Sequence, residues 1–338
     1  MKELAEAKST YKSTSSWRPF KGVKNDAGIY VPSPQEKSYW SEADELFAGG
    51  AGGGGKTGLI VGLALTAHQR SLILRRESTQ LKEVKTQLLQ WAPPGSKFRQ
   101  NGPYGGDLVT PDGRFIELGG CAVEEHKRKY QGRPHDAKFY DEVTEFTESM
   151  YDFINGWNRT STPGQRCRKV ATGNPPMSMA GQWVIRRWRA WIDPHAGHRA
   201  LPGTLKYYLK IEDKEQEFPD RTPIMWRGMS LVPQSRTFIP ARLADNPMLR
   251  DTDYASKLAL LPPALRDSLL YGDFGVSMRD DPWQVIPQTW IHESCERWEK
   301  NSRNGRPLSS AGLDLSYGGG DRTDRKSTRL NSSHDQRS

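Results

Sequence analysis

The chain has 338 residues, with 49 Lys and Arg against 40 Asp and Glu and a formal net charge of +9. This length is sufficient for two domains, and the basic balance favours a polyanionic partner. The three cysteines are far apart and lack C-x-x-C spacing, and the longest apolar run has seven residues, which excludes a disulfide framework, a zinc site and a membrane span. We expect a soluble protein in a reducing compartment.

The first 30 residues are polar and rich in Lys, Ser and Thr, which predicts a partly ordered arm. Residues 36–47 then predict a short helix followed by a strand. Gln35 lies 15 residues before a glycine-rich loop that begins at Gly50. A side-chain amide at this place can pair with both the donor and the acceptor edge of adenine. An ordinary surface side chain is the alternative interpretation.

The glycine-rich loop lies between the first predicted strand and a helix that includes residues 59–65. Residues 50–57 read G-x-x-x-x-G-K-T, the pattern of a phosphate-binding loop. Its glycines let backbone N–H groups point at an anion, Lys56 would reach the β- and γ-phosphates, and the Thr57 hydroxyl would ligate Mg²⁺. The helix N-terminus would also face the phosphates. A glycine-rich linker is the alternative. The residues of this loop predicted to bind nucleotide are Gly50, Gly52, Gly53, Gly54, Gly55, Lys56 and Thr57.

Strands and helices alternate after the loop. A buried strand over 71–76 ends in two arginines, a helix follows over 83–91, and strands are predicted over 114–118 and 136–140. This alternation predicts an α/β fold, a P-loop NTPase with a doubly wound, mainly parallel sheet. Ligands of such a sheet bind at the carboxyl ends of its strands.

An acidic pair follows the last of these strands. In ATPases with a phosphate-binding loop, a strand-end Asp holds Mg²⁺ and a neighbouring Glu polarises the attacking water. Asp141 is therefore the predicted metal ligand, and Glu142 is the predicted catalytic residue. A surface Asp-Glu pair is the alternative, and it would be favoured if the glycine-rich loop were absent.

The next predicted strand ends in a polar turn that contains Thr172 and Asn174. These residues could sense the γ-phosphate, although an ordinary strand and turn is the simpler interpretation. A helix over 182–192 carries tryptophans on one side and arginines elsewhere, which favours a core stripe and a solvated face over DNA contact. Further predicted elements are a strand over 205–211 and helices over 254–261 and 264–271.

The order of these motifs resembles that of the large terminase subunits of tailed double-stranded-DNA bacteriophages. The matching segments are 34–35, 49–57, 74–76, 129–132, 141–146, 172–176, 245–249 and 270–274. The resemblance covers about residues 31 to 323. It implies a DNA-packaging motor in which an ATPase domain is followed by a ribonuclease-H-like nuclease.

The resemblance implies roles for single residues. Gln35 would read adenine, and Lys56 would act in catalysis together with Glu142. Residues 172–174 would couple hydrolysis to movement, with Asn174 beside the nucleotide.

Motors of this kind also need an arginine that stabilises the transferring phosphate. Many terminases carry a basic residue inside the phosphate loop, whereas this loop has only Ala51 and glycines before Lys56. Arg159 is the candidate for this finger, acting on a neighbouring subunit.

The resemblance also divides the chain into an arm at 1–30, an ATPase domain at 31–277, a linker at 278–308 and the start of a nuclease domain at 309–323. Asp314 falls where this nuclease keeps its first metal-ligating carboxylate. The intact nuclease would hold two divalent metals, Mg²⁺ or Mn²⁺, and we expect its other ligands to be missing from the chain.

The end of the chain does not read like protein. Residues 324–334 back-translate into a widely used short-read sequencing adapter. We therefore expect 324–338 to be a non-native tail and the nuclease domain to be truncated. A genuine polar tail is the alternative.

The implied cofactors are ATP and Mg²⁺. The implied partners are double-stranded DNA, held mainly through its backbone, the portal protein, the small terminase subunit and further copies of the chain in a ring on the procapsid. We expect the protein in the host cytoplasm and transiently at the portal vertex, and not in the mature virion. Two rivals stay open. A helicase-like or other DNA-dependent ATPase would separate strands, and a basic nucleic-acid-binding protein would have no nucleotide affinity.

Overall fold

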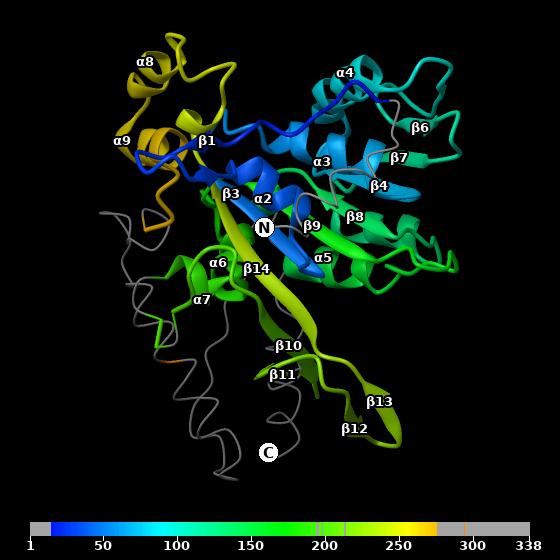
Figure 1. Cartoon of the computed structure of the whole chain (residues 1–338). Coiled ribbons are helices and arrows are strands. Elements are labelled where there is room, and N and C mark those ends of the chain that lie inside the picture. Colours follow the sequence, from blue (N-terminus) through cyan, green and yellow to red (C-terminus); the bar gives the residue numbers. More distant parts are fainter. Residues whose placement is uncertain (1–14, 194–195, 198, 213, 276–293, 295–338) are drawn as a thin grey trace, which may run out of the picture. The chain divides into compact units, whose positions relative to one another are not determined.

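A ten-stranded sheet lies at the centre of the structure, a computed structural model that describes residues 15–193, 196–197, 199–212, 214–275 and 294 (Figure 1). From one edge to the other, the strands are β11 (Lys214–Phe218), β10 (Lys206–Ile211), β14 (Gln234–Ala241), β3 (Glu45–Gly50), β9 (Arg168–Gly173), β8 (Ala137–Tyr140), β4 (Arg70–Arg75), β7 (Phe115–Gly120), β6 (Gly106–Val109) and β5 (Lys97–Gln100). The strands from β14 to β7 in this order are parallel. The predicted α/β fold with a mainly parallel central sheet is confirmed.

The outer strands on both sides are antiparallel. Short connections join β5 to β6 and β10 to β11, and a short connection can join only antiparallel neighbours. Two small ribbons lie apart from the main sheet: β1 (Val23–Lys24) pairs with β2 (Tyr30–Val31), and β12 (Ile224–Trp226) pairs with β13 (Met229–Leu231).

Helices cover both faces of the sheet, so the described chain has two cores. Successive strand residues point to opposite faces: Ile73 and Phe139 belong to one core, whereas Leu72 and Tyr140 belong to the other. The first core is covered by α2 (Pro34–Trp40), α3 (Lys56–Thr66) and α4 (Leu81–Trp91), and the second by α5 (Glu148–Asn155), α6 (Gln182–Arg187) and α7 (Arg189–Ile192). Burial on both faces is typical of a doubly wound sheet.

The predicted helix over 182–192 is interrupted. Trp188 leaves the helical conformation between α6 and α7, with φ −107° and ψ 21°. Its ring is buried against Phe47, and its Nε1 donates to the carbonyl of Thr237 at 3.0 Å. The predicted assignment of the tryptophans to the core is confirmed.

The described segment after β14 consists mainly of short helices. It contains α8 (Tyr254–Ala259), α9 (Pro263–Arg266) and the π-helical turn η7 (Asp267–Tyr271). The predicted helix over 264–271 therefore changes from α to π geometry after Arg266. Short 3-10 helices are η2 (Ser78–Gln80), η3 (Glu124–Tyr130), η4 (Val143–Glu145), η5 (Met179–Gly181) and η6 (Leu243–Asp245).

The described part of the N-terminal arm packs on the first core. Trp17 is buried, and its ring occupies the space in which a side chain at Gly62 of α3 would lie. Ser15 donates its hydroxyl to the carbonyl of Trp91 at 2.6 Å. Ser15 and Trp17 are therefore part of the packed structure, whereas residues 23–31 are exposed.

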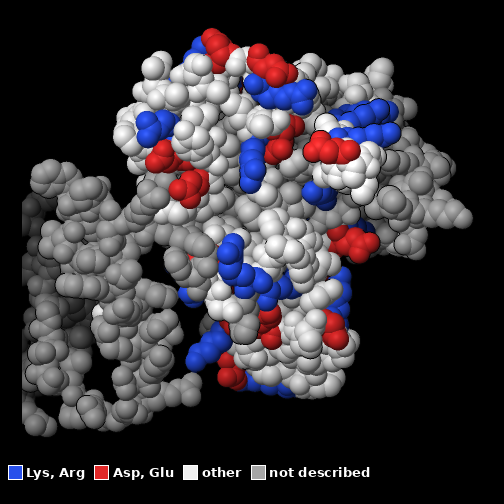
Figure 2. All heavy atoms as spheres, turned by 60° about the vertical axis from the view of Figure 1, so that its left-hand side comes forward, with Lys and Arg blue, Asp and Glu red and all other residues white. Residues whose placement is uncertain are grey.

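Charged side chains are mixed on the molecular surface. Figure 2 shows Lys and Arg interspersed with Asp and Glu over the described part of one face. On that face the basic excess of the sequence does not gather into one large patch. None of the helices in the described residues is long and apolar enough to cross a bilayer.

Candidate nucleotide-binding site

The glycine-rich loop connects β3 to α3, as the sequence predicts. Gly50, Gly53 and Gly55 have φ values of 137°, 75° and 76°, a region that favours glycine. A side chain at Gly54 would meet Cβ of Ala241 at 3.1 Å. The repeated glycines therefore fit both the backbone conformation and the close approach of β14.

Two loop amides are already used within the protein. The N–H of Ala51 donates to the carbonyl of Ala241 at 2.9 Å, and the N–H of Gly52 donates to the carbonyl of Leu269 at 2.6 Å. Gly52, predicted to bind phosphate, therefore has its amide engaged by η7.

Gly272 also packs on the loop. An added Cβ would lie 2.4 Å from the backbone N of Ala51, and the residue has a φ of 65°. The loop is thus contacted by the chain beyond β14.

Lys56 lies inside the loop and is buried. Its Nζ donates to the carbonyl of Ala51 at 2.5 Å and to Oδ1 of Asn174 at 2.8 Å. Burial lowers the pKa of the amine, while Glu142 and Asp141 act in the opposite direction. The ammonium is held over the loop, where a phosphate-binding Lys is needed.

Asp141 is fully buried at the end of β8 and is close to the hydroxyls of two threonines. Oγ1 of Thr57 donates to its Oδ2 at 3.0 Å, and Oγ1 of Thr172 donates to its Oδ1 at 2.7 Å. A hydroxyl and a carboxylate are oxygen ligands of the kind that Mg²⁺ prefers. Thr57 and Asp141 therefore fit the metal that the sequence predicts.

Glu142 has a left-handed backbone conformation, with a φ of 55°. For a residue with a side chain this conformation costs on the order of 1–3 kcal/mol, and such strain is concentrated at functional sites. Its Oε2 accepts from the backbone N–H of Asn174 at 3.2 Å. Burial, followed by repulsion from Asp141, raises the pKa of Glu142, and Lys56 opposes that shift.

Asn174 contacts both Lys56 and Glu142. Its Oδ1 accepts from Lys56, and its backbone N–H donates to Glu142. Thr172, two residues earlier, contacts Asp141. Thr172 and the turn that follows it, which the sequence presents as an ordinary strand end, therefore touch Lys56 and both carboxylates.

A cavity of about 690 Å³ opens beside the loop. The predicted residues that line it are Gln35, Gly52, Gly53, Gly54, Gly55, Lys56, Thr57, Glu142 and Asn174. Gly50 ends β3 directly before this part of the loop. The structure brings most of the predicted nucleotide site together around one cavity.

Gln35 is buried beside the loop with its amide engaged on both sides. Its Oε1 accepts from the N–H of Phe20 at 2.6 Å, and its Nε2 donates to the carbonyl of Gly55 at 2.9 Å. The side chain links the N-terminal segment to the residue that caps α3. Its predicted adenine contact stays a prediction, whereas its interpretation as a surface side chain is wrong.

Arg159 is not part of this cluster. Its backbone N–H donates to the carbonyl of His135 at 3.0 Å, and its guanidinium lies 5.5 Å from the ring centroid of Trp157. His135 lies two residues before β8 and Asp141 directly follows it, so six residue steps along an extended chain, roughly 20 Å, separate the two places. Within its own chain Arg159 therefore lies near the amino end of β8, at the opposite end of the strand from Asp141. Its role towards a neighbouring subunit stays a prediction. Asp314 lies outside the described residues.

Two residues of the site had no individual role in the prediction from sequence, although both lie in segments, 74–76 and 245–249, that match the terminase motifs. Arg75, at the end of β4, donates Nε to Oδ2 of Asp141 at 2.8 Å. Asn246 donates Nδ2 to the carbonyl of Gly53 at 2.6 Å and lines the cavity. The signals for Arg75 are its place in the matching segment 74–76 and its position at the carboxyl end of a buried strand, where ligands of a parallel sheet collect.

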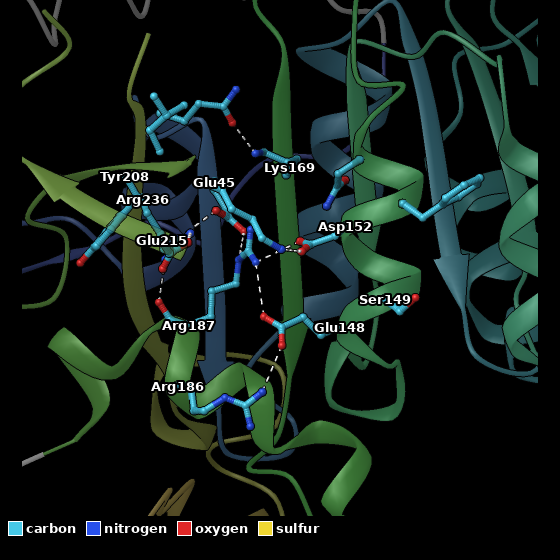
Figure 3. Close-up of a pocket in the computed structure, with 15 residues that line it drawn as sticks. Glu45, Glu148, Ser149, Asp152, Lys169, Arg186, Arg187, Tyr208, Glu215 and Arg236 are labelled. Carbon is cyan, nitrogen blue, oxygen red and sulfur yellow. Dashed lines mark hydrogen bonds and ion pairs between the residues drawn. The ribbon is translucent and has the colours of Figure 1, made fainter. Parts of the chain in front are cut away.

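A second cleft, of about 1030 Å³, lies at the amino ends of the parallel strands (Figure 3). At its base the buried Glu45 accepts from Arg187 at 2.6 Å and from Arg236 at 2.9 Å. Arg236 also pairs with Glu215, and Arg187 also pairs with Asp152. Because these charges already neutralise one another, we assign the cluster a structural role, joining β3 and β14 to α6 and the β10–β11 hairpin.

Replacing Glu45 with Gln should lower the free energy of unfolding by about 3 kcal/mol, because it removes the charge between two buried guanidinium groups. The two arginines hold the pKa of Glu45 well below its usual value. Its contribution is therefore complete above the unfolded pKa of about 4.3 and is lost as the pH falls towards the depressed folded pKa. Denaturant unfolding at several pH values measures this effect. Glu212→Gln, in an exposed ion pair with Arg227, is the matched control, and an equal loss in both variants would contradict the prediction.

No known family model matches the sequence, and no curated protein matches it. Among solved structures, the large terminase of the thermophilic bacteriophage D6E is similar, with a TM-score of 0.46, 13% sequence identity and coverage of 72% of this chain and 53% of that chain. The same protein with ATP-gamma-S gives a TM-score of 0.44 and 14% identity, covering 71% and 52%. The ATPase domain of the Thermus phage P74-26 large terminase gives 0.42 and 12%, covering 74% and 98%.

The chain is similar in fold to these large terminases. At such low identity the likeness concerns the fold alone. The chain spans about half the length of the D6E protein, since it covers 53% of it.

Proposed function

We propose that the chain is the ATPase part of a large terminase subunit, a motor that hydrolyses Mg-ATP to move duplex DNA into a procapsid. The observation that carries this proposal is the contact network among Lys56, Thr57, Asp141, Glu142 and Asn174 at the phosphate-binding loop. Each of these side chains has the chemical type that phosphoryl transfer to water requires.

The proposed roles follow from the contacts. Lys56 binds the β- and γ-phosphates, and the backbone amides of the loop other than those of Ala51 and Gly52 would surround them. Mg²⁺, held by Thr57 and through water by Asp141, would neutralise charge that develops on the phosphates. Glu142 polarises the attacking water, and Asn174 transmits the presence of the γ-phosphate from Lys56 to the turn after β9.

The remaining assignments rest on the sequence resemblance. They are an arm at 1–30, an ATPase domain at 31–277, a linker at 278–308 and a nuclease domain that begins at 309 with Asp314 as a metal ligand. The proposed partners are duplex DNA, the portal protein, the small terminase subunit and neighbouring copies of the chain, on whose nucleotide Arg159 would act. The proposed site of action is the procapsid portal vertex in the host cytoplasm.

The test is ATP hydrolysis by the 338-residue chain over a range of protein concentrations, with Mg²⁺ or with a chelator, and with or without duplex DNA. We expect Mg-dependent hydrolysis that rises faster than linearly with protein concentration, because an arginine comes from a neighbouring copy. Undetectable ATP binding would overturn the proposal and leave a basic nucleic-acid-binding protein. Strand separation without duplex translocation would favour the helicase-like alternative.

A further inference from the structure

We propose that Arg75 is a positioning residue that fixes the carboxylate of Asp141 so that it can hold the metal of Mg-ATP. This inference rests on the proposed function, because it assigns a role within the same site. It also supplies a reason for a buried arginine that the sequence motifs leave without a task.

Two nitrogens of the Arg75 guanidinium contact the same oxygen of the Asp141 carboxylate. Both Nε and Nη2 of Arg75 donate to Oδ2 of Asp141, at 2.8 and 2.6 Å. The arginine side chain is 15% exposed and the aspartate side chain is 1% exposed. A charge-assisted pair with this geometry, shielded from water, restricts the rotation of the carboxylate far more than a surface ion pair does.

The two oxygens of Asp141 have different surroundings as a result. Oδ2 accepts both nitrogens of Arg75, whereas Oδ1 accepts from Thr172 at 2.7 Å. Thr57 lies between them, 3.0 Å from Oδ2 and 3.3 Å from Oδ1. Arg75 thus holds Oδ2, the oxygen nearer to the Thr57 hydroxyl, while Thr172 holds Oδ1, so the carboxylate is fixed at both oxygens beside the hydroxyl that would ligate the metal.

The pairing register of the sheet brings Arg75 and Asp141 together. Strands β4 and β8 are parallel neighbours with Leu74 opposite Tyr140, and the N–H of Asp141 donates to the carbonyl of Leu74 at 2.9 Å. Arg75 and Asp141 each follow the last residue of this paired register. The contact is therefore built on regular backbone hydrogen bonds, which define a position better than a loop does.

Arg75 acts through Asp141 and does not touch nucleotide directly. Lys56, Glu142 and Asn174 line the cavity, whereas neither Arg75 nor Asp141 is among the described residues that do so, and Arg75 lies behind the carboxylate that it contacts. Partners that orient a metal-binding carboxylate commonly change metal affinity by about 10- to 100-fold when they are removed. The same size of effect is expected here.

The experiment measures equilibrium binding of a fluorescent methylanthraniloyl ATP to the full chain, with Mg²⁺ and with EDTA. The readout is the dissociation constant in EDTA divided by the dissociation constant with Mg²⁺. This ratio reports how strongly the metal increases the affinity for the nucleotide. We expect Arg75→Gln to reduce this ratio by about tenfold or more with little change in EDTA, and Arg75→Lys to recover part of it. Arg76→Gln is the matched control, because Arg76 contacts Met150 and not the carboxylates.

A double-mutant cycle makes the test specific. Asp141→Asn alone should abolish the metal effect, and adding Arg75→Gln to it should cause no further loss, because the arginine acts only through that carboxylate. Additive losses, an unchanged or larger ratio in Arg75→Gln, or equal weakening with Mg²⁺ and EDTA would each overturn the inference. If wild type binds no nucleotide at all, the proposed function itself fails. Thermal unfolding of each variant shows whether it is folded.

Discussion

Replacing Glu142 with Gln should lower the turnover number for ATP hydrolysis by about a thousandfold, the usual size of a general-base contribution. ATP affinity should stay within about threefold of wild type, a change of about 0.6 kcal/mol. Gln keeps the shape of the side chain and its contact with Asn174, but it cannot polarise a water as a carboxylate does. Single-turnover hydrolysis and separate binding measurements distinguish the two effects.

The pH dependence provides a control for this assignment. Burial and Asp141 raise the pKa of Glu142, and the reaction uses the ionised form. Wild-type hydrolysis should therefore fall as the pH drops through this raised pKa, at a higher pH than for an ordinary glutamate. The residual activity of Glu142→Gln should lack that step. A variant that keeps more than about a tenth of wild-type turnover would contradict a general-base role.

Replacing Lys56 with Ala should abolish measurable hydrolysis and weaken ATP binding by about a hundredfold, or about 2.7 kcal/mol. The ammonium is buried and lies over the loop in contact with Ala51 and Asn174, so no solvent-exposed lysine can replace it. Titration calorimetry with ATP and with ADP measures the loss.

Lys85→Ala is the matched control, because that lysine of α4 is engaged with Gln100 and Phe98. It should leave both binding and hydrolysis unchanged. If Lys56→Ala bound ATP as tightly as wild type, the loop would not be the phosphate site.

Local sequence patterns were sufficient to predict the central features of the site. The spacing of Gly50, Gly55, Lys56 and Thr57 determines a loop between a strand and a helix, and the structure has that loop. The acidic pair at Asp141 follows a buried strand, so its place at the carboxyl edge was predictable as well.

The contacts that depend on strand order could not be predicted. Arg75 meets Asp141 because β4 lies beside β8, and residues 66 positions apart carry no local sign of that pairing. Gln35 is engaged by Phe20 because the N-terminal segment folds back over the loop, which a polar composition does not reveal. The break at Trp188 likewise follows from the burial of its indole in the second core, a tertiary effect that overrides helical periodicity.

The residues of the proposed site follow the ends of four adjoining strands, β3, β9, β8 and β4. Continuous backbone hydrogen bonds and two packed cores hold these strands together, and such cores do not deform gradually. One rigid frame, the sheet with its two cores, therefore holds the loop, the acidic pair, the turn at Asn174 and Arg75. In the proposed motor, any force produced during a hydrolysis cycle would be delivered by segments attached to that frame, such as the turn after Asn174 and the chain that touches the loop at Gly272. The sheet would supply the fixed support against which those segments push.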